Sequence, residues 1–290
     1  MCTRNAASGK SALWLSVVVL GLNWPVMKLG LDYVSPFWML ALRYGLCVPA
    51  VGLFVLVTRR RLPTLIKADV PVILGVAALQ FVMQMGLVTW GLQHIPAGTA
   101  SILIYTTPLW LFFIDWIALR QRPDLRRTAL VSFSAIGCGV VVAGSTGEVA
   151  IIPLATILLA SVFWSLSMRL IGNHRWAGGV RDALFWQFLL ASIVVFPIAW
   201  WAEGPLSGAV FSWPSIGYLL FIGPVASGLG FGLMVFAGHR LPAPRIAMLS
   251  TAAPVIGFIT ATVILAEPLI PSVIFGGVII IGALLLGARK

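Results

Sequence analysis

Ten long apolar stretches occupy most of this 290-residue chain, and they constrain its fold more than any other feature. A helix needs about 20 predominantly apolar residues to cross a bilayer. Only 9% of the residues are charged, whereas soluble domains carry about 25%, so most of the surface must face lipid. The period-two alternation of a membrane β-barrel is absent. The sequence predicts an all-α polytopic membrane protein with ten transmembrane helices, at 12–30, 36–57, 71–92, 98–119, 127–143, 151–171, 181–201, 214–236, 245–265 and 271–288.

Basic residues are confined to alternate connections between these stretches. Of the 19 Lys and Arg residues, all but Lys28 and Arg43 lie near the chain ends or near the second, fourth, sixth and eighth connections. Short basic connections stay in the cytoplasm. We therefore expect a multi-pass protein of the cell inner (plasma) membrane with both termini cytoplasmic. This pattern explains the net charge of +11 without nucleic acid as a partner, and it makes membrane lipid the expected partner of the basic surface.

The two halves of the chain resemble each other. The segment IPAGTASILIYTTPLW, which begins at Ile95, aligns with LPAPRIAMLSTAAPVIG, which begins at Leu241, and ordered matches continue on either side. Such ordered matches indicate a duplication, with one five-helix repeat at 1–146 and another at 147–290. Because five is odd, the second repeat must enter the membrane from the opposite side. Inverted repeats of this kind are typical of secondary transporters, which bind substrate near the midplane between the repeats.

These motifs make the sequence similar to EamA-type members of the drug/metabolite transporter superfamily. The resemblance rests on the run NWPVMKLGLDYVSPF that begins at Asn23, on the two segments quoted above, and on Glu267–Pro268 followed by a glycine-rich last helix. It covers the whole chain and implies a ten-helix, 5+5 fold that moves small organic solutes, often outward. The first repeat of the family usually ends its fourth helix with a glutamate. Gln121 stands there in this chain, which puts a role for an acid at that site in doubt.

Lys28 and Arg43 lie inside otherwise apolar stretches. A charged side chain within a span costs roughly 2.5–3.5 kcal/mol on insertion scales, so it calls for a reason. The tilt of Cβ bonds toward each helix N-terminus brings the two cations to one depth near the outer mouth. They either bind or gate a solute carboxylate or phosphate or have structural partners. In the second case Lys28 reaches the interface or pairs with Asp32, and Arg43 pairs with Glu267 or a helix-end carbonyl.

Three of the prolines within the predicted helices are candidate hinges. Pro25 follows Asn23 and Trp24, which we count among the residues that bind substrate or gate its passage. Pro108 and Pro254 occupy matching places in the two repeats. A proline inside a helix removes a hydrogen bond and frees a carbonyl, which lipid tolerates only beside protein or a wet cavity. We expect the three prolines to act as hinges.

Other polar and aromatic residues near mid-span complete the predicted site. Gln80 and Gln84 are four residues apart and share a helix face, where they form a polar wall with Tyr105 or simply join neighbouring helices. Trp110 and Trp164 offer an indole N–H and a flat ring face to a substrate, or they pack within the bundle.

Asp115 is the one acid well inside a predicted span. It either couples transport to protons or forms an ion pair with Arg120 or Arg169. The three cysteines and three histidines form no metal-ligand, redox or catalytic spacing, so we expect no metal, no cofactor and no enzymatic activity.

The sequence therefore predicts a secondary transporter that exports a small amphipathic metabolite, such as an amino acid or organic anion, by alternating access. The alternative is an intramembrane enzyme or lipid-handling protein that uses the buried cations to bind a head group. We expect a monomer or homodimer with a small-molecule solute as its partner.

Overall fold

The chain folds into helices, with no β-strand among the residues that the computed structural model describes, 2–119, 124–145 and 151–288. Short 3-10 and π-helical segments carry the label η. The first half contains α1 (Cys2–Gly30), α2 (Pro36–Arg59), η1 (Lys67–Asp69), α3 (Val70–Val76), η2 (Ala77–Gln84), α4 (Met85–Leu92), α5 (Ala97–Leu103), η3 (Ile104–Thr106), α6 (Thr107–Leu119) and α7 (Leu125–Ser145). The second half contains α8 (Ile151–Asn173), α9 (Val180–Glu203), η4 (Gly208–Phe211), α10 (Trp213–Leu220), η5 (Phe221–Gly230), α11 (Phe231–Gly238), α12 (Ala243–Ser250), α13 (Ala252–Leu265) and α14 (Pro271–Ala288).

These elements form ten spans. Spans 1 to 5 are α1, α2, η1 to α4, α5 to α6, and α7, and spans 6 to 10 are α8, α9, α10 to α11, α12 to α13, and α14. Within the described residues, nine spans are long and apolar enough to cross a membrane, and Pro271–Gly287 is a shorter apolar helix in the tenth. The predicted ends agree to within a few residues, except that α1 begins at Cys2. The prediction of an all-α polytopic membrane protein is confirmed.

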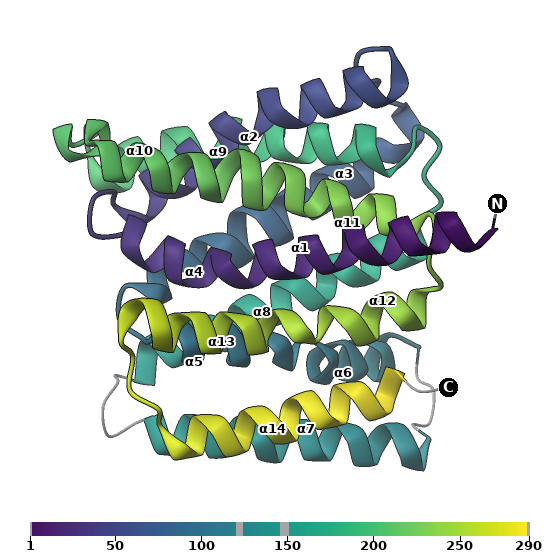
Figure 1. The fold of residues 1–290 in the computed structure, drawn as a ribbon, viewed down its shortest axis with the longest axis vertical. Helices are drawn as coiled ribbons and strands as arrows, with labels where there is room; N and C mark the ends of the chain where they lie inside the picture. The colour runs from purple at the N-terminus through teal and green to yellow at the C-terminus, as the bar shows by residue number, and fades with distance from the viewer. Residues whose placement is uncertain (1, 120–123, 146–150, 289–290) are drawn as a thin grey trace.

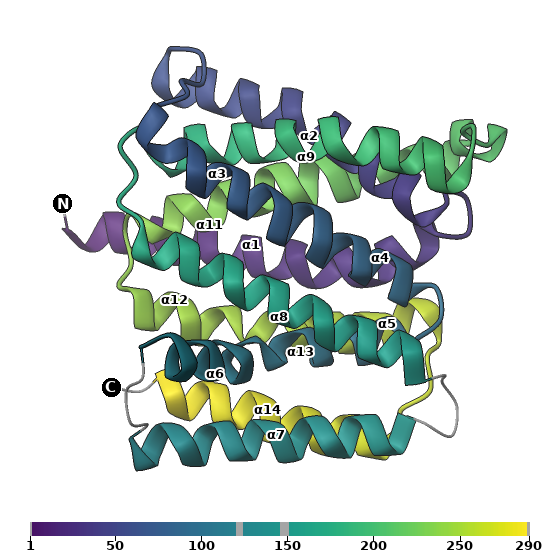
Figure 2. The same ribbon diagram turned by 180° about the vertical axis from the view of Figure 1, so that it is seen from behind.

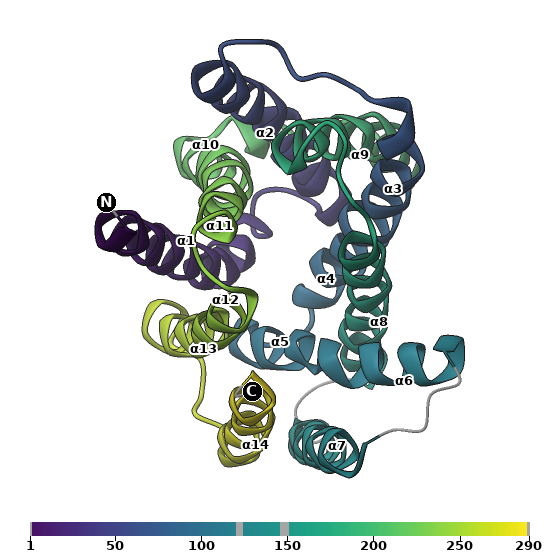
Figure 3. The same cartoon turned by 90° about the vertical axis from the view of Figure 1, so that its right-hand side faces the viewer.

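The two halves run through the bundle in opposite directions. α1 begins at the end of the bundle where α14 finishes, which we call the terminal end, whereas α8 begins at the opposite or far end (Figures 1 and 2). Viewed from the terminal end, α7 and α14 lie together at one edge, and the other spans surround the centre (Figure 3). Five spans in each half produce this inversion. The predicted boundary between residues 146 and 147 lies outside the described residues.

The third and fourth spans of each half carry backbone irregularities at corresponding places. The third spans contain the π-helical segments η2 and η5. The fourth spans are broken, by η3 in the first half and by a turn at Thr251 in the second. Single π-helical turns inside α-helices occur frequently at functional sites. The duplication is therefore visible in the backbone as well as in the sequence.

Two prolines lie in the first turn of the helices that follow the breaks. Pro108 is the second residue of α6, and Pro254 is the third of α13. A proline has no N–H, so it removes one hydrogen bond from a helix that continues through it, but none from a helix that begins at it. The hydroxyls of Thr107 and Thr251 each donate, at 2.6 Å, to a carbonyl three residues earlier. By contrast, α1 runs through Pro25 without a break. The hinge role of the three prolines stays a prediction.

α7 and α14 approach each other closely through glycines. A Cβ atom at Gly276 would lie 2.5 Å from the carbonyl oxygen of Gly137, and one at Gly137 would lie 2.8 Å from the carbonyl oxygen of Gly276. Membrane helices associate by packing rather than by the hydrophobic effect, and small residues let their backbones meet. The pairing of the two peripheral spans therefore depends on these two positions.

We expect Gly276→Ala to lower the free energy of unfolding by about 1–3 kcal/mol, because the new methyl group would overlap the α7 backbone. The matched control is Gly282→Ala on the same helix, where a Cβ would meet nothing within 4 Å. The control should stay within about 1 kcal/mol of the parent or become more stable, since alanine favours helices. Denaturant unfolding in detergent measures both, and equal effects would contradict the close contact.

Candidate functional site

Two glutamates at the far end bind the N-termini of helices from the other half. Glu203, at the end of α9, accepts hydrogen bonds from the backbone N–H of Phe37 at 2.9 Å and of Trp38 at 3.0 Å. Glu267 accepts from the N–H of Ala97 at 2.6 Å and of Gly98 at 2.9 Å. The first N–H groups of a helix lack intrahelical partners and favour negative charge. Both acids therefore join the two halves.

Lys28 binds the opposite kind of helix end, the C-terminus of α4. Its Nζ donates to the carbonyl oxygens of Leu92, Gln93 and Ile95 at 2.5, 3.0 and 3.0 Å. The last carbonyls of a helix attract cations. A pocket of about 410 Å³ opens beside Lys28, lined by Lys28, Leu29, Asp32, Ile264, Leu265 and Glu267. Lys28 thus has a structural partner at the rim of the bundle, but this partner is not the predicted Asp32.

Arg43 is buried inside the bundle, with 2% of its surface exposed. Its Nε donates to the Ser227 hydroxyl at 2.7 Å, and its Nη1 lies 3.1 Å from the sulfur of Met27 and 3.9 Å from that of Met85. Thioether sulfur is a weak acceptor. No carboxylate pairs with Arg43 within the described residues. A guanidinium has five N–H donors, and within the described residues those on the two Nη atoms have no strong acceptor.

Lys28 and Arg43 do not lie at one depth. Lys28 contacts the carbonyl of Leu92, whereas Arg43 contacts Met85, seven residues earlier on α4. Seven helical residues span about 10 Å. The expectation that the two cations share one depth is therefore wrong. Lys28 contacts the last residue of α4 and Arg43 the first, and both contacts join residues distant in the sequence.

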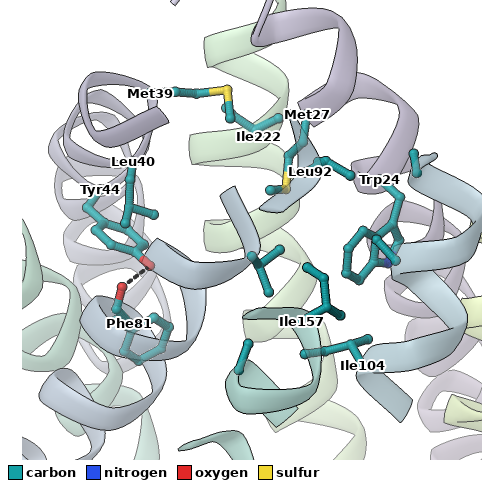
Figure 4. Packing of buried hydrophobic residues seen from close by; sticks show 14 of the residues in the cluster. Trp24, Met27, Met39, Leu40, Tyr44, Phe81, Leu92, Ile104, Ile157 and Ile222 are labelled. Atoms are coloured by element: carbon teal, nitrogen blue, oxygen red, sulfur yellow. Dashed lines mark hydrogen bonds between the residues drawn. The ribbon is translucent and has the colours of Figure 1, made fainter. Parts of the chain in front are cut away.

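Asn23 belongs to the same polar group as Arg43. Its Nδ2 donates to the sulfur of Met27 at 2.9 Å, and this sulfur also faces Arg43. Its Oδ1 is buried and has no hydrogen-bond partner in the described part of the chain. Met27 and the neighbouring Trp24 point from α1 into the buried core (Figure 4). We call Asn23, Met27, Arg43, Met85 and Ser227 the central cluster.

The π-helical segment η5 contacts α2 directly at Arg43. A Cβ at Gly223 would lie 2.8 Å from the carbonyl oxygen of Arg43, so this contact requires a residue without a side chain. Pro224 lies within η5 and removes an N–H from its hydrogen-bond ladder. Ser227 donates to the carbonyl of Ile222 at 2.8 Å while it accepts from Arg43. The irregular backbone thereby fixes the orientation of the Ser227 hydroxyl.

The other π-helical segment, η2, also contacts α2. Tyr44, next to Arg43, donates from its hydroxyl to the carbonyl of Phe81 at 2.7 Å (Figure 4). Met85 follows η2 immediately and places its sulfur near Arg43. The central cluster therefore draws its residues from α1, α2, α4 and η5, which belong to both halves of the chain.

The two glutamines of the predicted polar wall lie in η2 and are buried. The Oε1 atom of Gln80 accepts a hydrogen bond from the Ser167 hydroxyl of α8 at 2.7 Å. The side chain of Gln84 is 3% exposed. Gln80 therefore joins two helices, and solute binding by Gln84 stays a prediction.

The predicted aromatic residues all pack within the bundle, but two of them have an indole N–H without a hydrogen-bond partner among the described residues. Tyr105 meets Trp164 edge to face, with ring centroids 5.7 Å apart. The indole N–H groups of Trp110 and Trp164 are buried without partners among the described residues. Trp24 packs against α13, where a Cβ at Gly257 would lie 2.9 Å from its ring. Trp24 therefore has a packing role, while Trp110 and Trp164 still carry free donors.

Asp115 forms an ion pair with Arg169, and its side chain is 42% exposed. This is one of the two structural partners expected from the sequence; the other, Arg120, lies outside the described residues, as does Gln121. The pair accounts for the position of Asp115, and a part in proton coupling stays a prediction.

Two buried acids at the terminal end were not singled out from the sequence. Asp69 accepts from the Nε2 of His174 at 2.8 Å and from two backbone N–H groups of the connection between α8 and α9. Asp182 binds Arg61 at 2.7 Å. No group of three or more His, Cys, Asp or Glu residues in the described segments is arranged to hold a metal ion.

Sequence reasoning also missed the partners of Arg43. Asn23 and Met27 are four residues apart, so a shared helix face was a usable signal. Ser227 lies 184 residues from Arg43, and nothing in the local sequence connects the two. The signal available there was Pro224 within a run of small residues, which marks an irregular helix.

Comparisons with known proteins agree with this architecture. The chain is 26% identical to the transporter YvbV of Bacillus subtilis, over 97% of this chain and 92% of that protein. It is 25% identical to a "probable amino-acid metabolite efflux pump" of Salmonella typhimurium, over 93% and 91%. A protein of known crystal structure has the same fold, with a TM-score of 0.61 and 18% identity over 96% of this chain and 98% of the other.

The family model for EamA-like transporters matches the chain twice, at residues 7–143 and 151–288. Together these matches cover nearly the whole chain, and each contains five of the spans described above. The chain belongs to the EamA-like transporter family and is a multi-pass membrane transporter.

Proposed function

We propose that this protein is a secondary transporter that exports a small amphipathic metabolite of the amino-acid class by alternating access. The observation that carries the proposal is the buried guanidinium of Arg43, which has one hydroxyl, two thioethers and no carboxylate around it in the described segments. An ionisable residue inside a membrane span is by default a candidate functional residue, because burying its charge is costly.

The chemistry of Arg43 favours a carboxylate as the bound group. A guanidinium presents paired N–H donors that match the two oxygens of a carboxylate. Ser227 holds the Nε of Arg43, whereas the two Nη atoms have no strong acceptor among the residues that the structure describes. The side chain is thus oriented at one edge and free at the other. A bound carboxylate would supply the negative charge that the buried site lacks.

Asn23 extends this reasoning to the second charge of an amino acid. Its unpartnered Oδ1 is an acceptor, and the Met27 sulfur lies between Asn23 and Arg43. An ammonium group would donate to this oxygen while the carboxylate bound Arg43. The name of the Salmonella relative, an amino-acid metabolite efflux pump, agrees with this substrate class and with the outward direction.

The inverted halves supply the means of movement. The central cluster lies between them, and the breaks at η3 and Thr251 occur in the span that follows each π-helical segment. We propose that these breaks let the far end and the terminal end open in turn. The location that we propose is the cell inner membrane with the terminal end in the cytoplasm, because the basic connections lie at that end.

We expect Arg43→Gln to reduce amino-acid counterflow in proteoliposomes by about thirtyfold or more, since removing one partner of a buried charge pair costs at least about 2 kcal/mol. The melting temperature should stay level or rise, because the variant removes an unpaired buried charge. In the parent, methyl esters of the same amino acids should be transported to a similarly reduced extent. Undiminished transport by Arg43→Gln would contradict the proposal.

Lys28→Gln is the matched control, because it removes the other cation within a span. It should lower the free energy of unfolding by about 1–3 kcal/mol, as its hydrogen bonds to carbonyls are lost, and it should keep the preference for acids over esters. The same proteoliposomes test the alternative function when their lipids are analysed as well. Turnover of a lipid without counterflow of any amino acid or organic anion would favour an intramembrane enzyme or lipid-handling protein.

Asp115→Asn tests proton coupling. An exposed ion pair contributes at most about 1 kcal/mol, so the variant should fold normally. We expect its efflux to respond to an imposed pH gradient as the parent does, because Arg169 accounts for the acid. Efflux from proteoliposomes with and without the gradient measures this. Loss of the response in the variant alone would show that Asp115 is the coupling residue.

A further inference from the structure

Three arginines from different elements gather at the terminal end, away from the central cluster. Arg59 is the last residue of α2, Arg181 is the second residue of α9, and Arg240 follows α11. Arg59 lies against Gly179, two residues before Arg181, and the charges of Arg59 and Arg240 act on Arg181, as does the opposite charge of Asp182. Like charges therefore lie close together, although they repel one another.

Backbone contacts fix two of these arginines beside α9 and α11. Arg59 donates to the carbonyl oxygen of Gly178 at 3.4 Å, and its Nη2 lies 2.6 Å from where a Cβ of Gly179 would be. Arg240 donates to the carbonyl of Phe236 at 3.3 Å, and its guanidinium carbon lies 3.5 Å from the centre of the Phe236 ring. Both guanidinium groups are therefore held in place without a carboxylate.

Arg181 has an unsatisfied donor. Its Nε is buried and has no hydrogen-bond partner within the described residues, and its guanidinium carbon lies 5.8 Å from the centre of the Phe54 ring. The acids at this end are already engaged: Asp182 binds Arg61, and Asp69 binds His174 and the backbone. The ion pairs among the described residues include none of the three arginines, although the charge of Asp182 also acts on Arg181.

We propose that Arg59, Arg181 and Arg240 form a binding site for a phosphate group, separate from the transport site. Arginines recognise phosphate through paired N–H donors, and the N-terminus of a helix such as α9, which begins one residue before Arg181, favours a negative charge. The phosphate comes either from the head group of an anionic phospholipid or from solution. The site lies where α2 ends and α9 begins, and α2 exposes the apolar side chains of Leu53 and Val57 nearby, so a lipid fits both features.

The test uses the full chain in phosphatidylcholine nanodiscs at fixed ionic strength. One arm replaces part of the lipid with phosphatidylglycerol, and the other adds inorganic phosphate to the buffer. A ligand that binds the folded state raises the melting temperature. In each arm we compare the ligand concentration that gives half of the maximal rise in melting temperature. The proteins compared are the parent, Arg181→Gln, and the double variant Arg59→Gln/Arg240→Gln. The control is Arg175→Gln, an exposed arginine of the connection between α8 and α9 that is not among the charges acting on Arg181.

We expect phosphatidylglycerol to stabilise the parent and Arg175→Gln alike, and to bind about tenfold more weakly when Arg181 is lost, because a charge-assisted hydrogen bond disappears. The double variant gives an independent reading if Arg181→Gln does not fold. The same pattern with inorganic phosphate alone would identify a soluble ligand of the same site. An equal loss in Arg175→Gln, no loss in the cluster variants, or no stabilisation in either arm would overturn the proposal.

Discussion

Within a bilayer, every buried polar group must find its partner inside the protein, and this constraint explains where the charges of this transporter lie. Three charged side chains form hydrogen bonds with the backbone groups at helix ends, which lack intrahelical partners: those of Glu203, Glu267 and Lys28. Asp69 and Asp182, both buried, are held by His174 and Arg61. Of the buried charged side chains in the described residues, Arg43 is the one without an opposite charge.

The irregular backbone segments η2 and η5 both lie at the central cluster around Arg43. A regular α-helix satisfies its own backbone, so a π-helical turn or a break at mid-span needs a reason. η5 brings Gly223 against α2 and Ser227 against Arg43, and η2 ends immediately before Met85. Because η2 and η5 occupy corresponding spans, each half places one irregular element in the cluster or directly beside it. A site built from both halves changes when the halves move, which alternating access requires.

The fold was predictable because hydropathy and charge act along the whole chain. Span 2 was expected at 36–57 and is found at Pro36–Arg59. The site was predictable only in part. Lys28 and Arg43 both stand out as charges within spans, but the partners that distinguish them lie 64 and 184 residues away. The π-helical segment η2 has no proline or other local signal, since tertiary contacts determine it.

The most direct test of the central claim is a cryo-electron microscopy structure of the protein with a bound amino acid that it transports. The account predicts that the ligand carboxylate lies within hydrogen-bond distance of the two Nη atoms of Arg43, with the ammonium group facing the Oδ1 of Asn23. A ligand bound instead in the far-end pocket beside Lys28 and Glu267, with Arg43 still surrounded by Met27, Met85 and Ser227 alone, would contradict it.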